Sequence, residues 1–227
     1  MGIDGLHYGE IARSLRLVCQ GAATLSVDTG PTDTVTVNSN LLFSVGDEVV
    51  LADASGAAEE HSVVQLIGLH GVRLDAAVSG AYTVAAQGRL QLAAALRPEV
   101  KWVAVGRPEA IPEPARLEFP AVIIAPGTMK QPPDEGSNRA YEQKYTLQVY
   151  YVDRYQEGVE ADMDALEEAG RLFNLIMADP YLGGTCYHSQ VVEFEPSPQA
   201  EEKLRSKELP LRVVRMEVLA QRMEMWG

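Results

Sequence analysis

The chain has 227 residues, of which 46% are hydrophobic and 22% charged, and its formal net charge is −13 at pH 7. This length fits one large domain or two small ones, and the apolar fraction argues against a largely disordered chain. The negative charge argues against a surface that wraps nucleic acid non-specifically, because such binding depends on Lys and Arg neutralising phosphates.

Two cysteines, Cys19 and Cys186, lie far apart in the sequence. We expect both to be free, buried thiols in a reducing cytoplasm, with a disulfide between them as the alternative. The first ten residues lack the basic and apolar segments of a secretory signal, and no apolar run approaches the roughly 18 residues of a membrane span. We therefore expect no membrane partner.

The first part of the chain predicts a helix followed by a β-rich module. Over residues 6–20 an apolar stripe recurs at helical spacing, formed by Leu6, Ile11, Leu15 and Val18. Six short β-rich runs then alternate with turn signals, a pattern typical of a small all-β barrel or sandwich, here resembling an SH3-like barrel. The six runs are 24–28, 34–38, 48–52, 62–67, 72–74 and 82–85.

Beyond residue 93 the pattern predicts an α/β core. Residues 100–103 and the apolar run 119–125 predict two strands, and the tyrosine-rich alternation over 141–152 predicts a long third one. The next segment, 160–178, predicts an amphipathic helix that ends at Asp179-Pro180. Its expected apolar face consists of Met163, Leu166, Gly170, Phe173 and Met177.

The C-terminal part predicts a hairpin. Residues 188–194 and 211–222 alternate as strands, and we expect them to pair beside the 141–152 strand. Two long polar loops, 126–139 and 195–210, are expected to be exposed. Both faces of the last strand carry apolar residues, so some of them are expected to face another subunit. The candidates are Leu211, Val213, Leu219, Met223, Met225 and Trp226.

The predicted fold class is therefore α+β, with a small mixed or antiparallel sheet packed by helices. Residues 1–22 and 94–227 form this core, and residues 23–93 form an inserted small all-β barrel. An excursion of this kind is easy when the two ends of the inserted module lie close together.

Two groups of residues could carry chemistry. Cys186 and His188 share a strand face, but a thiol nucleophile needs an activating environment that the sequence does not contain. A helical carboxylate cluster could hold a metal, although a solvated helix face explains it more simply. Its members are Glu160, Asp162, Asp164, Glu167 and Glu168. We expect no catalytic residue, no cofactor and no metal.

The chain resembles the tail terminator proteins of tailed bacteriophages over residues 1–20 and 96–227. The resemblance rests on the order of six features. They are the Phe119-Pro120-Ala121-Val122 strand, a long loop, the strand 141–152, the helix 162–178, Leu182-Gly183-Gly184, and the closing hairpin.

The resemblance implies a virion protein, assembled in the host cytoplasm, that forms a ring, usually of six subunits, on the last ring of tail tube protein. Such a ring stops tube growth and presents the docking surface for the neck or connector. Six chains of charge −13 carry −78 in total, so DNA would be repelled from an acidic lumen and pass without specific binding. The β module would sit on the outer rim.

The two polar loops and the C-terminal end are the expected interfaces with neighbouring subunits and the tube. The residues expected there are Met129, Lys130, Asp134, Glu135, Arg139, Glu201, Lys203, Arg205, Lys207, Met223 and Trp226. Three alternatives stay open: another head–tail neck or adaptor ring protein, a small hydrolase or metal enzyme using the groups above, and a sugar- or surface-binding module carried by residues 24–92.

Overall fold

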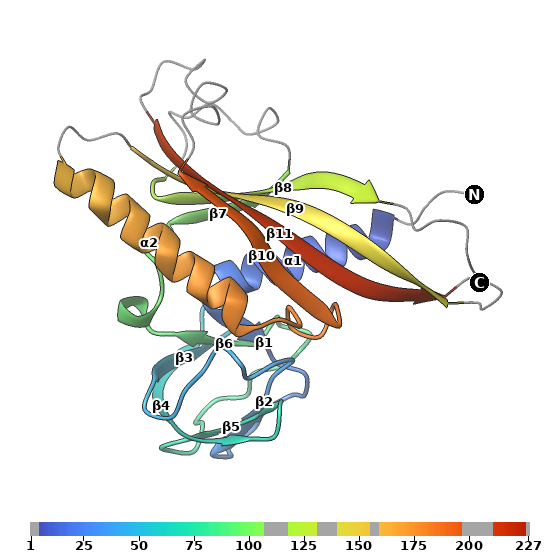
Figure 1. Cartoon of the computed structure of the whole chain (residues 1–227). Coiled ribbons are helices and arrows are strands. Elements are labelled where there is room, and N and C mark those ends of the chain that lie inside the picture. The colour runs from blue at the N-terminus through green and yellow to red at the C-terminus, as the bar shows by residue number, and fades with distance from the viewer. Residues whose placement is uncertain (1–4, 107–117, 131–139, 155–158, 197–210, 226–227) are drawn as a thin grey trace. The chain divides into compact units, whose positions relative to one another are not determined.

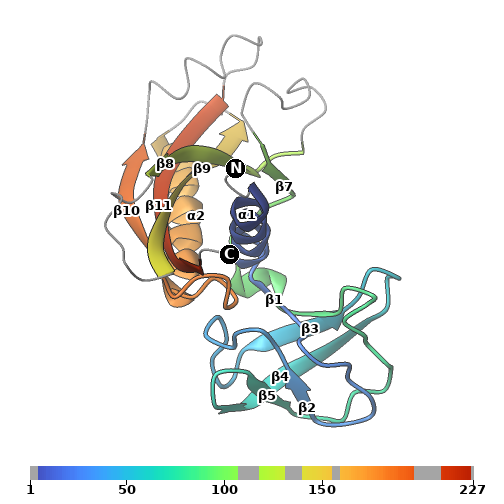
Figure 2. The same cartoon turned by 90° about the vertical axis from the view of Figure 1, so that its right-hand side faces the viewer.

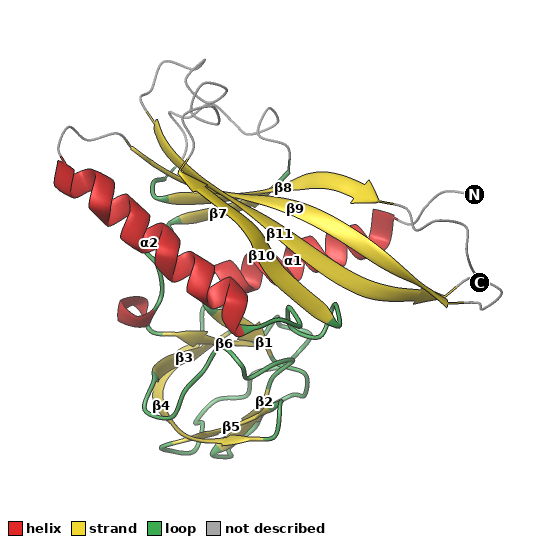
Figure 3. Cartoon of the chain, viewed as in Figure 1, coloured by secondary structure: helices red, strands yellow, loops and turns green. Residues whose placement is uncertain are grey.

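A computed structural model describes residues 5–106, 118–130, 140–154, 159–196 and 211–225. The fold is mixed α+β, with two α-helices and two sheets (Figures 1 and 3). The chain divides into two compact units, one of residues 1–16 with 99–227 and one of residues 17–98. No helix among the described residues has the length and apolar character needed to cross a membrane.

The first unit is built on a five-stranded sheet. Its strand order is β10-β11-β9-β8-β7, and every neighbouring pair is antiparallel except β7 and β8. The expected hairpin beside the tyrosine-rich strand is confirmed, because β11 pairs with both β10 and β9. The elements are α1 (Gly5–Cys19), β7 (Trp102–Val105), β8 (Ala121–Lys130), β9 (Ala140–Arg154), α2 (Val159–Ala178), β10 (His188–Pro196) and β11 (Leu211–Met225).

The pairing of β9 with β11 forms the centre of this sheet. Both strands are 15 residues long and stay in register from Arg154–Leu211 to Ala140–Met225. The central part of one face of the pair is apolar, because buried residues oppose each other at alternate positions. The opposed pairs are Tyr145–Ala220, Leu147–Val218, Val149–Met216 and Tyr151–Val214.

Both helices lie against this apolar face, and Figure 2 shows the sheet curving around them. From α1, the Tyr8 ring packs edge-on against Tyr145 at 6.1 Å, and its hydroxyl donates to the Thr146 carbonyl at 3.1 Å. From α2, the Phe173 ring packs edge-on against Phe194 of β10 at 5.8 Å. An aromatic pair therefore docks each helix on the sheet, and a partly buried hydroxyl hydrogen bond adds to the docking of α1.

The buried side of α2 differs from the expected one. Met163 and Met177 are 63% and 42% exposed, whereas the buried positions are Ala165, Ala169, Leu172, Leu175 and Ile176. Both sets have helical spacing, so periodicity alone does not separate them. The small alanines let the helix backbone approach a sheet that is already filled with aromatic rings.

The expected loop over 126–139 begins later in the structure, because β8 continues to Lys130. Pro126 and Gly127 lie in an irregularity of the β8–β9 register rather than in a loop. A Cβ atom at Gly127 would lie 2.7 Å from the Thr146 carbonyl oxygen, so this close approach requires glycine. Likewise β10 continues to Pro196, inside the second expected loop.

The opposite face of the sheet carries a second apolar cluster at one end. It includes Leu211 and Val213, which the sequence offered as residues facing another subunit, but they are only 1% and 2% exposed. The expectation is wrong for these two because they pack within the chain. Their buried partners are Phe119, Ala121, Ile123 and Val152, with Trp102 and Tyr150 partly buried beside them.

The second unit is a strongly curled six-stranded sheet of order β1-β6-β3-β4-β5-β2. Its two ends are joined beyond the edge strands, because the Ser26 N–H donates to the Thr36 carbonyl and the Asn38 N–H to the Thr24 carbonyl, both at 2.9 Å. The elements are β1 (Ala22–Thr24), β2 (Thr34–Thr36), β3 (Glu48–Ala52), β4 (Ala58–Ile67), β5 (Gly71–Leu74), β6 (Arg89–Leu92) and the short 3₁₀ helix η1 (Ala94–Leu96).

One expected strand of this unit, 82–85, is wrong. Tyr82 forms only an isolated bridge with Thr29, and the Gly88 N–H donates to the Thr83 carbonyl to close a turn. The strand lies instead at β6, where buried Leu90 and Leu92 alternate with half-buried residues. The β-branched residues of 82–85 are used in a turn because tertiary pairing overrides β-propensity.

Glu59 of β4 holds the loop between β5 and β6 in the second unit. Its carboxylate accepts the Ser79 and Gly80 N–H groups at 2.8 and 2.7 Å and the Tyr82 hydroxyl at 3.0 Å. These hydrogen bonds, first among them that from the Ser79 N–H, lower the pKa of Glu59 from 4.5 to about 2. The side chain is 19% exposed, so solvent screens these bonds only partly.

This arrangement predicts acid sensitivity of the second unit. The folded carboxylate stays ionised down to about pH 2 while the unfolded one protonates near 4.5, so its stabilisation is lost as pH falls through that window. Glu59→Gln should lower the free energy of unfolding at pH 7 by about 1–3 kcal/mol. Between pH 5 and 2, unfolding of the variant should also take up about one proton fewer than unfolding of the unmodified chain. Urea denaturation at several pH values measures this number from the pH dependence of the unfolding free energy.

The matched control is Glu60→Gln, an exposed neighbour in the same strand. It should leave stability within about 0.5 kcal/mol of the unmodified chain, as most surface substitutions do. Equal loss in both variants would contradict the role assigned to Glu59.

Candidate functional site

An apolar strip lies exposed along one edge of the first unit. We define the edge strip as Met177 of α2 with Val192 and Phe194 of β10, together with the half-buried Phe173 of α2 that packs against Phe194. Figure 1 shows the two elements side by side. Met177, Val192 and Phe194 are 42%, 46% and 39% exposed. The Met177 sulfur accepts the Val191 N–H at 3.4 Å, which holds helix and strand together. Grouped apolar side chains at a free sheet edge are typical of interaction surfaces.

The edge strand β10, which carries part of the edge strip, has two features that limit the addition of further strands. A register irregularity between Val191 and Glu193 disrupts the β10–β11 ladder at Val192. Arg215 of β11 pairs with Glu193 and Glu195 at 2.8 and 2.9 Å, so two negative charges stand along β10. Bulges and charges discourage unlimited strand addition, so this edge favours contact through side chains.

Most of the residues expected at interfaces cannot be placed on this surface. Met223 is 56% exposed near the end of β11, opposite Glu142. Met129 and Lys130 belong to β8, where they oppose Tyr145 and Lys144. The others lie outside the described residues: Asp134, Glu135, Arg139, Glu201, Lys203, Arg205, Lys207 and Trp226. Sequence reasoning missed the edge strip, because the residues of α2 and β10 that form it were assigned to the core or left as ordinary strand positions.

Cys186 and His188 do not form a nucleophile–base pair. The Cys186 thiol is 6% exposed, and its sulfur contacts the Pro180 carbonyl at 3.8 Å. Burial, reinforced by Asp179, raises the pKa of this thiol to about 11. An activated cysteine needs the opposite shift, since the thiolate is the reactive form. Both Cys186 and Cys19 are free and buried.

The α2 carboxylates engage in local contacts. Glu167 and Glu168 pair with Arg171 at 3.1 and 3.3 Å, and Glu168 also accepts the Glu99 N–H at 2.8 Å. Asp164 is exposed, whereas Asp162 and Glu160 have side chains outside the described set. Within the part of the chain that the structure describes, no three His, Cys, Asp or Glu side chains converge on a metal position.

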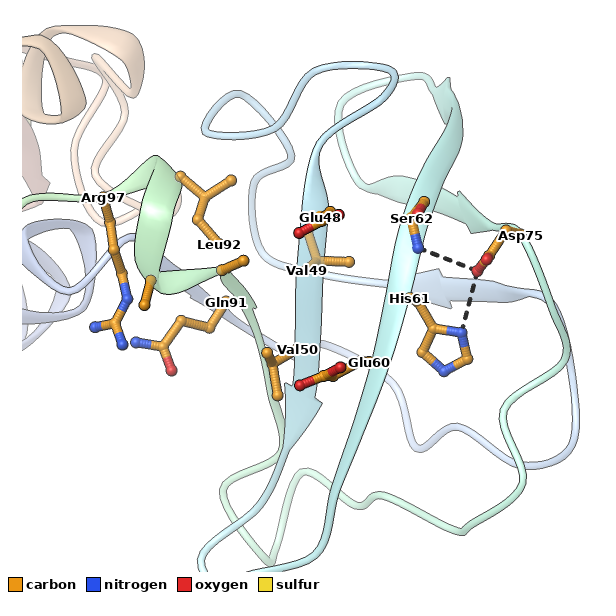
Figure 4. Close-up of a pocket in the computed structure, with 12 residues that line it drawn as sticks. Glu48, Val49, Val50, Glu60, His61, Ser62, Asp75, Gln91, Leu92 and Arg97 are labelled. Carbon is orange, nitrogen blue, oxygen red and sulfur yellow. Dashed lines mark hydrogen bonds and ion pairs between the residues drawn. The ribbon is translucent and has the colours of Figure 1, made fainter.

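The second unit carries a groove of about 530 Å³ on the outer side of β6, β3 and β4 (Figure 4). On β3, Val49 and Leu51 are buried in the sheet interior, so Glu48 and Val50 face outward. Glu60 and Ser62 of β4 and Gln91 of β6 share that side by register. Arg97, which follows η1, closes one end. This volume suits a small ligand or a short chain segment.

A buried histidine stands behind the groove. The His61 side chain is 5% exposed, with Nδ1 3.4 Å from Asp75 Oδ1 and Nε2 3.6 Å from Glu59 Oε2. Asp75 also accepts the Ser62 N–H at 3.1 Å, as Figure 4 shows. The imidazole therefore hydrogen-bonds to Asp75, while its Nε2 is buried without a hydrogen-bond partner among the described residues.

The cysteine environments predict slow alkylation. With a pKa of about 11, roughly one thousandth of Cys186 is thiolate at pH 8, and burial limits access further. Native protein should incorporate iodoacetamide at least about tenfold more slowly than urea-unfolded protein, measured by intact mass. Rapid modification of one native thiol that disappears in Cys186→Ala would instead revive the cysteine-hydrolase alternative.

No protein-family model matches this chain, and no curated protein matches its sequence significantly.

Proposed function

We propose that this protein is a tail terminator of a tailed bacteriophage: a structural virion protein that forms a ring on the tail tube, stops its elongation and presents the docking surface for the head and neck. The edge strip carries this proposal, because a grouped apolar surface at a sheet edge is what a neighbouring subunit would cover. The partners are further copies of the chain, the tube protein on one side and a connector protein on the other.

The order of elements in the first unit supports the same proposal. The apolar strand β8, the long strand β9, the helix α2 and the β10–β11 hairpin follow one another as in the family that the sequence resembles. Between α2 and the hairpin, the Asp179 carboxylate accepts the Tyr181 and Gly183 N–H groups at 3.2 and 2.8 Å, forming the turn at Leu182-Gly183-Gly184. We assign the first unit as the terminator-like core and the second as an inserted SH3-like barrel.

The energetics of the edge strip suit a ring. Burying a whole Val, Met or Phe side chain contributes about 1.5–3 kcal/mol, and Met177, Val192 and Phe194 are each 39–46% exposed. Covering these exposed parts would contribute roughly 2–4 kcal/mol per contact, which is too little for a stable dimer alone. In a closed ring every subunit makes such a contact with a different surface of its neighbour, so the small free energies of the individual contacts add up around the ring.

The charge of the chain supports passage of DNA. Six copies of net charge −13 carry −78 in total, and an acidic lumen repels phosphates over about a Debye length. DNA would then move through the ring without arrest.

Electron microscopy of particles assembled without this protein tests the proposal. Tubes of uncontrolled, excess length that fail to join heads are expected, because nothing would stop subunit addition. Tails of normal length beside DNA-filled heads would replace the proposal with a neck-adaptor function. Normal, complete particles would overturn both.

A charge placed in the edge strip tests its role separately. Phe194→Glu should reduce ring occupancy on purified tail tubes at least tenfold, because a carboxylate would be buried against the neighbouring subunit. Val64→Glu is the matched control, since Val64 is 50% exposed on β4 of the second unit. Negative-stain imaging counts capped tube ends, and far-ultraviolet circular dichroism checks folding. Equal capping by both folded variants would exclude the edge strip as a subunit contact.

A further inference from the structure

The groove of the second unit separates opposite charges. Glu60 on one side and Gln91 on the other both oppose Val50 in the register. Two inter-strand spacings of about 4.8 Å therefore place these two positions about 10 Å apart. Glu48 lies on the middle strand β3, two residues before Val50, and Arg97 lies beside Gln91 in Figure 4. The groove thus has two carboxylates on β3 and β4, the apolar Val50 beside them, and a cation beyond β6 at the other end.

Among the described residues, no carboxylate pairs with the cationic end. Arg97 donates to the Gln20 carbonyl at 3.5 Å, and that carbonyl already accepts the Gln91 amide at 2.9 Å. The Nε atoms of Arg97 and Arg89 are buried without an acceptor among the described residues. Burial and the neighbouring Arg89 lower the pKa of Arg97. A partly buried guanidinium beside a second cation is costly unless an anion pairs with it.

The lining narrows the class of ligand. The described residues that form the groove include no Phe, Tyr or Trp, and the one imidazole, of His61, is buried, so they offer no stacking surface for sugars or bases. A free amino acid carries its charges only about 3 Å apart and cannot span the two ends. An extended polypeptide rises about 3.1 Å per residue with three residues per turn, so side chains three apart lie on one side, about 9 Å apart.

We propose that this groove binds an extended polypeptide segment that presents a carboxylate to Arg97 and, three residues away, a cationic side chain to Glu48 and Glu60. The apolar middle of the segment lies over Val50. The proposal stands on the second unit alone and does not depend on the tail-terminator function.

Titration of the isotope-labelled full chain with short peptides, followed by amide NMR shifts, tests this site. Acetyl-Lys-Pro-Pro-Asp-amide has the required charges and spacing, and its prolines favour the extended conformation. We expect shifts confined to β3, β4 and β6 and a Kd of about 1 mM or below. Acetyl-Gln-Pro-Pro-Asn-amide should bind at least about tenfold more weakly. No shifts up to 10 mM of the charged peptide, or equal binding of the neutral one, would overturn the proposal.

Single substitutions test which residues at the two ends of the groove bind the charged groups of the peptide. Arg97→Gln should raise the Kd of the charged peptide about tenfold, and Glu60→Gln should raise it severalfold. Arg73→Gln is the matched control, because Arg73 is an arginine of the same unit that already pairs with Asp33 at 2.9 Å. Since Arg97→Gln can disturb folding, Arg97→Lys is tested beside it and should retain partial binding. Unchanged binding in Arg97→Gln, or equal loss in Arg73→Gln, would refute the assignment.

Discussion

The antiparallel pairing of β9 with β11 is the interaction on which the first unit depends. Fifteen residues on each strand stay in register, so one continuous apolar face forms from residues far apart in sequence. Tyr8 of α1 packs on that face against Tyr145, and Phe173 of α2 packs against Phe194 of the neighbouring strand β10. A slip of one residue would turn every buried side chain outward, and therefore the alternation in the two strands specifies the whole layer.

The helices cover the apolar face of the sheet, but the edge strand β10 still carries exposed apolar side chains. β10 is the last strand of the sheet, and α2 covers its inner side without hiding Val192 or Phe194. The paired charges of Arg215, Glu193 and Glu195 keep this edge soluble and limit strand addition. A surface of this kind is suited to a defined contact with another subunit, and that suitability links the fold to an assembly role.

The second unit meets a different constraint. Its curled sheet is small, and hydrogen bonds from two carboxylates hold the segments around it. Glu59 binds the Ser79–Tyr82 loop, and Asp75 binds Ser62 and His61. Arg97 has no such carboxylate among the described residues, although acidic residues outnumber basic ones by 32 to 19 in the chain. Glu59 and Asp75 have hydrogen-bond partners within the unit, whereas Arg97 has no carboxylate partner among the described residues. This difference distinguishes the groove that Arg97 lines from the rest of the unit's surface.

Local pattern in the sequence determined the helix near residues 6–20, the long strands and their hairpin, because alternation and helical spacing are properties of neighbouring residues. It misassigned 82–85, the buried face of α2 and the surroundings of Leu211, since each depends on which distant segment packs there. The edge strip and the charge-separated groove were decided only by tertiary structure. They arise where α2 meets β10, and where β3, β4 and β6 pair in register, and those adjacencies have no signature in local spacing.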